Sequence, residues 1–261
     1  KQYILGVQSE GVIATIKHFA ANSQQTMRMF NDARVSQRAL REIYLRGFEI
    51  AIREAKPWAV MSSYNRINGL HTQYSHKLLT DLLRKEWRFN GIVMTDWVEA
   101  RDTRAQVHAG NDLLMGGTPQ QVQDILDCVK KGTLTMAEIN NNVRRVLRYI
   151  MRTPHYRGVE ATFAPDLKAH AIKSREAAEE GIVLLENHNQ TLPLAKETRR
   201  VGMFGVSSYN FISVGTGSGN VKTPHTVNLL EGFANVGVET NADVAQTYQR
   251  IIRDTIAARA Y

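Results

Sequence analysis

The chain has 261 residues, 43% hydrophobic and 22% charged, which is typical of a soluble globular protein with one large domain or two ordinary ones. No apolar run approaches the roughly 18 residues of a membrane-spanning helix, and the single cysteine, Cys128, excludes an internal disulfide or a cysteine-based metal cluster. The net charge of +8 is spread over helix faces such as that of Arg144, Arg145 and Arg148, without interleaved aromatic residues. We therefore expect neither a nucleic acid nor a membrane as a partner.

The first part of the chain alternates short apolar strands with amphipathic helices. Val12–Lys17 is predicted to be a buried strand, and Arg38–Ala55 a helix with one apolar stripe, which Pro57 ends. A second strand is predicted over Ala59–Tyr64, followed by a turn signal at Asn68-Gly69. These segments have the alternation of a β/α protein with parallel strands.

The same alternation continues after the turn. Ser75 can cap a helix that carries several leucines and Trp87, and Asn90-Gly91 leads into a third strand that ends at Asp96. Asp112–Met115 is predicted to be a short fourth strand. A helix then runs to Lys131 and is closed by Gly132. Thr135 and Glu138 form a capping-box pattern that opens one more helix, ending at Arg152.

Four β/α units precede residue 152, whereas a closed (β/α)8 barrel needs about 250 residues. We therefore predict an α/β fold in which residues 1–152 form the C-terminal half of a (β/α)8 TIM-type barrel, with the first half outside this sequence. Residues 153–166 contain two prolines and a glycine without any period, and are interpreted as an interdomain linker.

Residues 167–261 are predicted to be a second α/β unit that is cut short at the end of the sequence. It opens with a helix over Leu167–Glu180 and a strand over Gly181–Leu185, followed by a strand over Arg200–Val206. Helices are predicted over 228–235 and over 242–259.

Polar or aromatic residues stand at the ends of three successive predicted strands. Lys17 and His18 end the first strand, Tyr64 ends the second, and Asp96 with Trp97 ends the third. The C-terminal ends of parallel strands form the catalytic face of a barrel. Asp96 has the position of a nucleophilic carboxylate, beside a Trp97 ring that could stack on a sugar. Lys17 and His18 could donate hydrogen bonds to sugar hydroxyls, and Tyr64 could orient the nucleophile.

Each of these residues also has a structural interpretation. Asp96 could cap a helix or form an ion pair, His18 and Tyr64 could be core residues, Lys17 a surface residue, and Trp97 a plug at the barrel rim. Spacing alone leaves these alternatives open. The joint placement at three strand ends favours a sugar site.

Other chemistries find less support in the sequence. The eight histidines do not fall into a metal-ligand spacing, so no metal site is expected. Gly215, Gly217 and Gly219 lack the dinucleotide spacing, and no Gly-Lys-Ser/Thr follows them, so a nucleotide-binding function has only a weak basis and no cofactor is expected. The absence of a Gly-x-Ser-x-Gly elbow argues against a serine hydrolase.

The motifs at the strand ends resemble those of glycoside hydrolase family 3, the β-glucosidase and β-xylosidase family. Ile16-Lys17-His18-Phe19 resembles the family's Lys-His-Phe motif, and residues 61–65 resemble its Ser-Tyr-Asn segment. Thr95-Asp96-Trp97 resembles the stretch that holds the family's nucleophile. In the second region, residues 180–187 resemble the start of the family's α/β sandwich, and residues 217–221 resemble its Gly-Ser-Gly loop. The resemblance covers nearly the whole chain and keeps the motif order.

This resemblance implies a retaining exo-β-glycosidase acting on terminal β-D-glucosyl or xylosyl residues of a β-linked oligosaccharide or glycoside. Asp96 would be the nucleophile, with Lys17 and His18 on the non-reducing-end sugar, Tyr64 beside Asp96, and Trp97 lining the site toward the leaving group. Residues 167–261 would form the N-terminal part of the α/β sandwich domain. The family's acid/base glutamate would fall beyond Tyr261, so residues 1–261 alone are expected to be inactive.

Two departures from the family pattern and one alternative function stand beside this interpretation. Thr95 replaces a more usual Ser, and Ser23-Gln24-Gln25 replaces a more typical Asn-Gln-Glu. A non-catalytic relative would bind sugar through Lys17, His18 and Trp97 without cleaving it, although retention of the aspartate argues against this. The sugar (glucose, xylose, α-arabinose or another), the linkage, the oligomeric state and the compartment, whether periplasmic, secreted or cytoplasmic, stay open.

Overall fold

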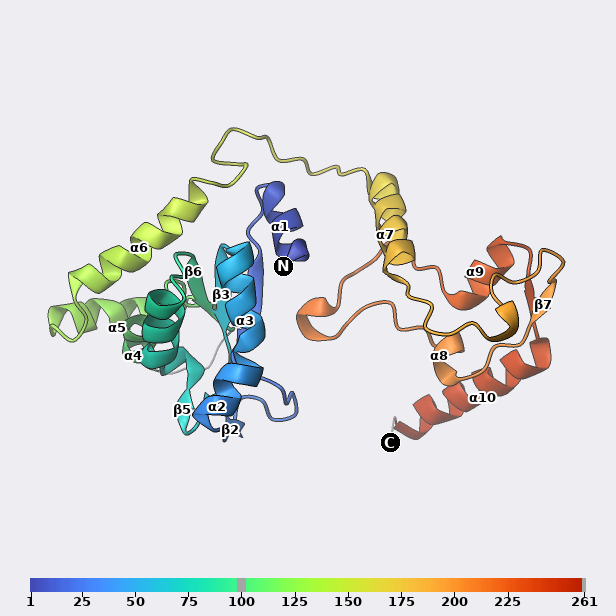
Figure 1. The fold of residues 1–261 in the computed structure, drawn as a ribbon, viewed down its shortest axis with the longest axis horizontal. Coiled ribbons are helices and arrows are strands. Elements are labelled where there is room, and N and C mark those ends of the chain that lie inside the picture. The colour runs from blue at the N-terminus through green and yellow to red at the C-terminus, as the bar shows by residue number, and fades with distance from the viewer. Residues whose placement is uncertain (98–101, 260–261) are drawn as a thin grey trace. The chain divides into compact units, whose positions relative to one another are not determined.

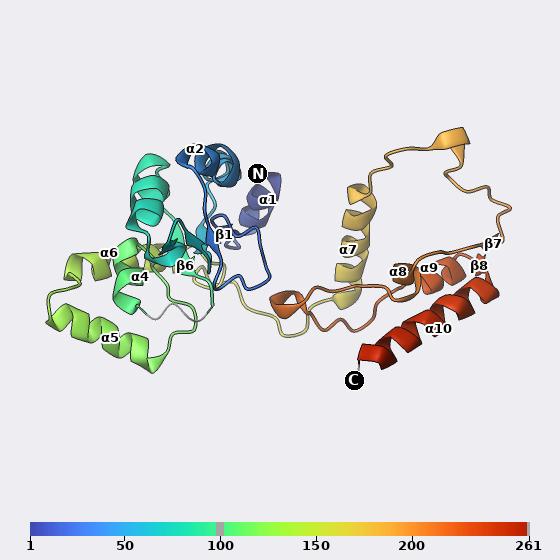
Figure 2. The ribbon, with the colours of Figure 1, turned by 90° about the horizontal axis from the view of Figure 1, so that it is seen from below.

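The computed structural model describes residues 1–97 and 102–259. The chain divides into two compact units, Lys1–Pro165 and Asp166–Tyr261 (Figures 1 and 2). None of the described helices has the length and apolar character needed to cross a bilayer.

The first unit is built on a three-stranded parallel sheet. Its order is β1 (Thr15–Phe19), β3 (Ala59–Ser62) and β6 (Ile92–Thr95). Strands β3 and β6 lie within the second and third predicted strands. The first strand starts later than predicted, at Thr15, and runs through Lys17 and His18 to Phe19. The pair β3–β6 is in continuous parallel register, from Ala59 opposite Ile92 to Ser62 opposite Thr95. The pair β1–β3 shifts its register between Ile16 and Phe19. The mixed α/β content of the chain is therefore as expected.

The predicted fourth strand at Asp112–Met115 is wrong. This segment makes a single parallel bridge, between Leu113 and Met94. The backbone amides of Asp112 and Leu113 both donate to the carbonyl of Val93, and the Val93 amide donates to the Asp112 carboxylate at 2.8 Å. A side-chain oxygen thus takes the place that a backbone carbonyl has in a regular ladder.

Helical segments connect the strands (Figure 1). Between β1 and β3, α2 (Gln37–Ala39) and α3 (Arg46–Ile50) are joined by one π-helical turn and extended to Ala55 by another. This confirms the helix predicted over Arg38–Ala55, which ends where Lys56 takes a left-handed conformation. Between β3 and β6, Lys77–Glu86 is also π-helical. The Ser75 hydroxyl accepts a hydrogen bond from the Leu78 amide, as a cap does.

A second, small sheet precedes this helical segment. It contains β2 (Asp32–Ala33), β4 (Arg66–Ile67) and β5 (Leu70–His71). The last two strands are antiparallel, and the turn between them is Asn68-Gly69, with positive φ at both residues. The turn signal in the sequence is confirmed.

The two faces of the main sheet pack against different helices, because successive strand residues point to opposite sides. One cluster holds Val60 and Val93 against leucines of the two long helical segments, including Leu79 and Leu83. The other holds Ala59 and Ile92 against Tyr149. At the start of β6, a side chain on Gly91 would collide with the carbonyl oxygen of Trp58 and the ring of Phe89. The strand therefore enters the sheet at a point where only glycine fits.

Three further helices follow β6, and α1 (Gln2–Ser9) precedes β1. They are α4 (Thr103–Ala109), α5 (Pro119–Lys130) and α6 (Met136–Ile150). The predicted capping box at Thr135 and Glu138 is present at the start of α6. Gly132, predicted to close the preceding helix, has a φ of 69° just after its end.

A fully buried carboxylate ties β6 to two helices. Oδ2 of Asp112 accepts hydrogen bonds from Arg84 at 2.5 Å and from the Val93 amide, and its Oδ1 accepts one from Arg145 at 2.8 Å. Burial lowers the pKa of Arg84, and the negative charge of Asp112 opposes this effect. The Asp112 and Arg84 side chains are buried in the unit's interior, and the Arg145 side chain is partly exposed.

The second unit is mostly helical. It contains α7 (Leu167–Gly181), α8 (Val206–Tyr209), α9 (Leu229–Asn235) and α10 (Ala242–Arg259), with a two-stranded parallel sheet of β7 (Arg200–Val201) and β8 (Glu239–Thr240). The helices predicted over 228–235 and 242–259 are confirmed.

Two strand predictions for this unit are not met. The strand expected at Gly181–Leu185 is wrong, because α7 runs through Gly181 and no regular structure follows it. Its apolar side chains from Ile182 to Leu185 are exposed. The strand expected over Arg200–Val206 is reduced to two residues, and α8 starts at Val206.

The buried carboxylate gives a stability prediction. Asp112→Ala should lower the free energy of unfolding of the first unit by about 3–5 kcal/mol, because it leaves the Arg84 charge buried without its partner. Chemical denaturation followed by circular dichroism measures this. The matched control is Glu42→Ala, which removes the exposed partner of Arg38 and should leave the transition nearly unchanged. Equal effects of the two substitutions would contradict the prediction.

Candidate active site

The ends of β1, β3 and β6 meet at one edge of the sheet, because the three strands are parallel and adjacent. Backbone pairing continues past the strands: the Asp96 amide donates to the Ser62 carbonyl at 3.1 Å, and the Ser63 amide donates to the Phe19 carbonyl at 2.9 Å. The position of Asp96 is therefore fixed by the sheet and not by a free loop. The Lys17–His18 peptide bond, at the corresponding end of β1, is cis.

The Asp96 side chain is 9% exposed, and its two carboxylate oxygens have different surroundings. Oδ1 accepts a hydrogen bond from the Trp97 amide at 2.8 Å. Oδ2 is buried and has no hydrogen-bond partner among the described residues. Nε2 of His18 lies 3.5 Å from Oδ2, an electrostatic contact without hydrogen-bond geometry. A carboxylate oxygen whose lone pairs accept no hydrogen bond is free to attack, as a nucleophile must be.

His18 is half-buried, and its surroundings pull its pKa in opposite directions. Burial lowers the pKa of the imidazole most strongly, the negative charge of Asp96 raises it, and the positive charges of Lys17 and Arg28 lower it. The net result is a lowered pKa, which favours the neutral ring at neutral pH. A neutral imidazole can both donate and accept a hydrogen bond.

The structure places the other predicted site residues at the same edge, in different environments. The Tyr64 hydroxyl donates to the backbone carbonyl of Trp97 at 2.5 Å. The Trp97 side chain is 54% exposed, so its apolar ring is available to a ligand. Lys17 is exposed, and its charge reaches His18.

Arg28 belongs to the site and was missed in the sequence. Its guanidinium lies 4.9 Å from the centroid of the Tyr64 ring, and its charge lowers the pKa of His18. It lies in a segment without strand or helix, where no periodicity relates it to the strand ends. The only signal was its place ten residues after His18 within the loop that follows β1.

Hydrogen bonds between buried polar groups hold the ends of β3 and β6 in place. The Ser62 hydroxyl donates to Oδ1 of Asn111 at 2.9 Å, and the Asn111 amide donates to the carbonyls of Gln73 and Gln106. The Thr95 hydroxyl, one residue before Asp96, accepts from the Met115 amide at 2.8 Å. These bonds hold β3 and β6 to the chain that follows them, which limits the freedom of the carboxylate.

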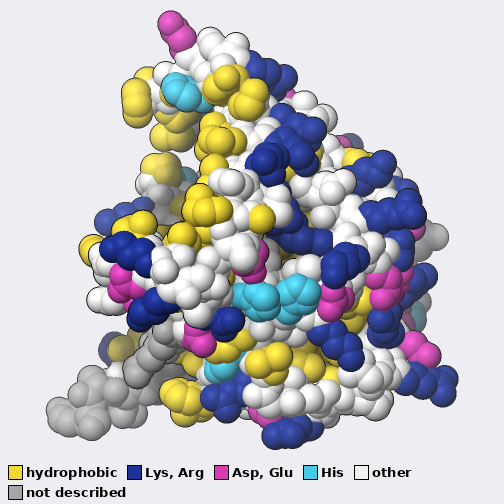
Figure 3. All heavy atoms as spheres, turned by 90° about the vertical axis from the view of Figure 1, so that its left-hand side faces the viewer, with side chains coloured by type: hydrophobic (Ala, Val, Ile, Leu, Met, Phe, Trp, Pro, Cys, Tyr) yellow, Lys and Arg dark blue, Asp and Glu magenta, His cyan; other side chains and the backbone are white. Residues whose placement is uncertain are grey.

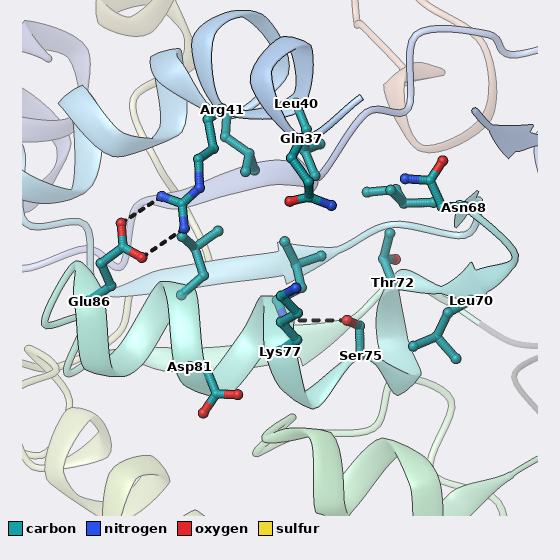
Figure 4. Close-up of a pocket in the computed structure, with 14 residues that line it drawn as sticks. Gln37, Leu40, Arg41, Asn68, Leu70, Thr72, Ser75, Lys77, Asp81 and Glu86 are labelled. Carbon is teal, nitrogen blue, oxygen red and sulfur yellow. Dashed lines mark hydrogen bonds and ion pairs between the residues drawn. The ribbon is translucent and has the colours of Figure 1, made fainter. Parts of the chain in front are cut away.

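A separate hollow of about 580 Å³ lies on the helical side of the first unit, and none of the predicted site residues lines it. Figure 4 shows it between the helix at Leu40 and the segment Lys77–Glu86, with the Arg41 guanidinium bound to both oxygens of Glu86. Its lining combines leucines with polar and charged side chains. The chemistry of the strand ends makes them the candidate active site in preference to this hollow.

The chain belongs to glycosyl hydrolase family 3. Residues 1–149 match the glycosyl hydrolase family 3 N-terminal domain, and residues 182–255 match the C-terminal domain of the same family. The resemblance found in the strand-end motifs is therefore confirmed.

Similar proteins carry glycosidase names. The chain is 37% identical over 245 residues to an exo-alpha-(1->6)-L-arabinopyranosidase of Bifidobacterium longum, which covers 90% of this chain and 32% of that protein. It is 39% identical over 242 residues to beta-glucosidase B of Emericella nidulans, covering 89% and 28%. The structure of beta-glucosidase 3B from Thermotoga neapolitana in complex with alpha-D-glucose superposes with a TM-score of 0.86 at 41% identity, covering 97% and 36%. The chain thus spans about a third of the length of these relatives.

The charge balance around His18 can be tested directly. Because Lys17 lowers and Asp96 raises the pKa of His18, Lys17→Met should raise that pKa and Asp96→Asn should lower it further. A pH titration of the His18 ring by NMR measures both changes, and shifts in the opposite directions would contradict this electrostatic assignment.

The lowered pKa of His18 also predicts how the stability of the folded protein changes with pH. As the pH falls through about 6.5, the ordinary pKa of a histidine, the unfolded chain takes up the His18 proton before the folded protein does. The free energy of unfolding therefore falls as the pH drops from about 6.5 to the lower folded-state pKa of His18, and it stays lowered below that pKa. His18→Gln should reduce the acid sensitivity of unfolding in this window.

Proposed function

We propose that this chain provides the nucleophile half of a retaining β-glycosidase, with Asp96 as the attacking carboxylate. The observation that carries the proposal is the buried Oδ2 of Asp96, which has no hydrogen-bond partner among the described residues and lies 3.5 Å from the His18 imidazole. The β-glucosidase names of several relatives support the reaction class. So does the glucose complex of the Thermotoga neapolitana enzyme.

The reaction would proceed in two displacements. Oδ2 of Asp96 attacks the anomeric carbon and forms a covalent glycosyl-enzyme, while an acid from outside residues 1–261 protonates the leaving oxygen. The same group, now a base, removes a proton from water, which attacks the anomeric carbon and releases Asp96. Two inversions give net retention.

The remaining strand-end residues would bind and orient the sugar. Lys17 and His18 can hydrogen-bond hydroxyls of the non-reducing-end residue, and the exposed Trp97 ring can stack toward the leaving group. Tyr64, bonded to the Trp97 carbonyl, would hold the backbone beside the nucleophile. The substrate would be a β-linked oligosaccharide or aryl glycoside, with glucosyl or xylosyl as the terminal residue.

The architecture proposed for this site is half of a barrel followed by the start of a sandwich. Residues 1–152 would be the C-terminal half of a (β/α)8 barrel, 153–166 a linker, and 167–261 the beginning of the α/β sandwich. The three-stranded parallel sheet supports this view, as does the extent of the chain, about a third of its relatives' length. The split of the chain after Pro165 is in keeping with the proposed linker.

The nucleophile assignment is tested in the full-length enzyme. Asp96→Asn should lower kcat for 4-nitrophenyl β-D-glucopyranoside by at least about 10³-fold, because an amide cannot form the glycosyl ester. It should also prevent covalent labelling by a 2-deoxy-2-fluoroglucoside, read by mass spectrometry of the peptide that contains Asp96.

The matched control is Asp127→Asn on α5, where the carboxylate accepts a hydrogen bond from Gln123 on the same helix face. This variant should retain both turnover and labelling. A folded Asp96→Asn enzyme with near-normal kcat would exclude Asp96 as the nucleophile. Sugar binding by calorimetry with no turnover in the unmodified enzyme would favour the alternative, a non-catalytic carbohydrate-binding relative.

The position of the acid/base gives a second test. Residues 1–261 alone should show no hydrolysis of aryl glycosides above the rate without protein, since one of the two required carboxyl groups is proposed to lie outside them. A panel of aryl glucosides, xylosides and arabinosides measures this, and in the full-length enzyme the same panel ranks the sugars. Turnover by residues 1–261 that Asp96→Asn removes would show that the second carboxyl group lies within them.

A further inference from the structure

Two histidines from different helical segments face each other on the first unit. His76 stands at the N-cap of the segment Lys77–Glu86, and His108 lies in the last turn of α4. Their ring centroids are 5.4 Å apart, and the ring planes are inclined by 30°. Both side chains are about half exposed. Figure 3 shows an adjacent pair of histidine side chains on the surface of this side of the molecule, next to acidic groups.

Each imidazole has a carboxylate at the same ring nitrogen. Nδ1 of His108 lies 2.7 Å from Oε1 of Glu138, and Nδ1 of His76 lies 3.4 Å from Oδ2 of Asp81. In Figure 4 the Asp81 carboxylate points away from the Arg41–Glu86 pair that borders the hollow. A carboxylate at Nδ1 favours the tautomer with the proton on that atom. The lone pair is then left on Nε2 of both rings, and no described residue bonds to either Nε2 atom.

The second oxygens of these carboxylates are occupied, which keeps the carboxylates in place. Oε2 of Glu138 accepts from the amide and hydroxyl of Thr135, and Oδ1 of Asp81 accepts from Lys85 at 2.8 Å. Burial raises the pKa of Glu138, but the bonds from Thr135 and His108 outweigh it and leave the pKa lowered. Glu138 is therefore ionised over the pH range in which imidazole is neutral.

We propose that His76 and His108 bind one divalent transition-metal ion of the Zn²⁺ class through their Nε2 atoms, with water completing the coordination. Zn–N bonds of about 2.1 Å place each ring centroid about 3.2 Å from the metal, and a tetrahedral angle then separates the centroids by about 5.2 Å. The observed centroid separation of 5.4 Å is close to this value, so the two rings are near enough to share one ion. A carboxylate behind each metal-binding histidine is the usual second shell of such a site.

The site differs from a structural zinc centre in having two protein ligands. The described residues hold no group of three histidine, cysteine, aspartate or glutamate side chains able to share a metal ion. The bound ion can therefore exchange with ions in solution. It links the end of α4 to the start of the Lys77–Glu86 segment. Binding to the folded form alone raises the unit's stability by mass action. This inference is independent of the role proposed for Asp96.

Zn²⁺ titration by calorimetry tests the site in the metal-stripped protein. His76→Gln and His108→Gln should each weaken Zn²⁺ binding by at least about tenfold, because one ligand of two is removed. Glu138→Gln should weaken binding by about 10–100-fold while keeping the capping box of α6, which glutamine also forms. The matched control is His225→Gln, which removes an exposed histidine paired with a single carboxylate, Glu231, and should leave the affinity unchanged.

The unmodified protein gives a second readout that does not depend on variants folding. Zn²⁺ should slow modification of His76 and His108 by diethyl pyrocarbonate and leave His225 unaffected, as read by peptide mass spectrometry. Zn²⁺ should also raise the thermal midpoint of the parent and not that of His108→Gln. The site is ruled out if neither histidine is protected, or if His225→Gln weakens binding as much as the other two histidine variants.

Discussion

The buried carboxylate of Asp112 is the constraint on which the first unit most depends. Its carboxylate accepts a hydrogen bond from the Val93 amide, and it pairs with the buried Arg84 and the partly exposed Arg145. Removing two charges from water costs free energy that a single ion pair rarely recovers, so such an arrangement persists when several hydrogen bonds converge on it. Here the convergence fixes β6 between two helices, and Asp96 follows that strand directly.

Much of the site followed from the sequence because parallel strands place their ends together. The pattern around Ile92–Thr95 predicted a buried strand, and Asp96 and Trp97 had to lie at its end. The same reasoning placed His18 and Tyr64. Arg28 could not be found in this way, since it lies in an irregular loop and reaches the site through the tertiary fold. The cis bond at His18 also leaves no trace in a periodic pattern.

The strand predictions failed where side-chain chemistry or missing neighbours decided the outcome. At Asp112–Met115 the apolar residues favoured a strand, but the carboxylate of Asp112 accepts the hydrogen bond of the Val93 amide, which a neighbouring strand would otherwise bond. At Gly181–Leu185 the β-branched residues favoured a strand, but a strand also needs a partner. In the second unit these side chains are exposed. Helices were predicted more accurately because their hydrogen bonds are local: α10 begins at Ala242, as expected, and continues to Arg259, the last described residue.

Gly91 shows that the position of a reactive group can be decided at the opposite end of its strand. The carbonyl of Trp58 and the ring of Phe89 close over the space where a side chain would stand. Four residue pairs then connect the start of β6 to its end, in register with β3. A methyl group at Gly91 would displace the start of this paired strand, and the pairing would carry the displacement to the strand's other end. In redesign of the site, this distant glycine belongs with the residues held constant, as firmly as the carboxylate it helps to place.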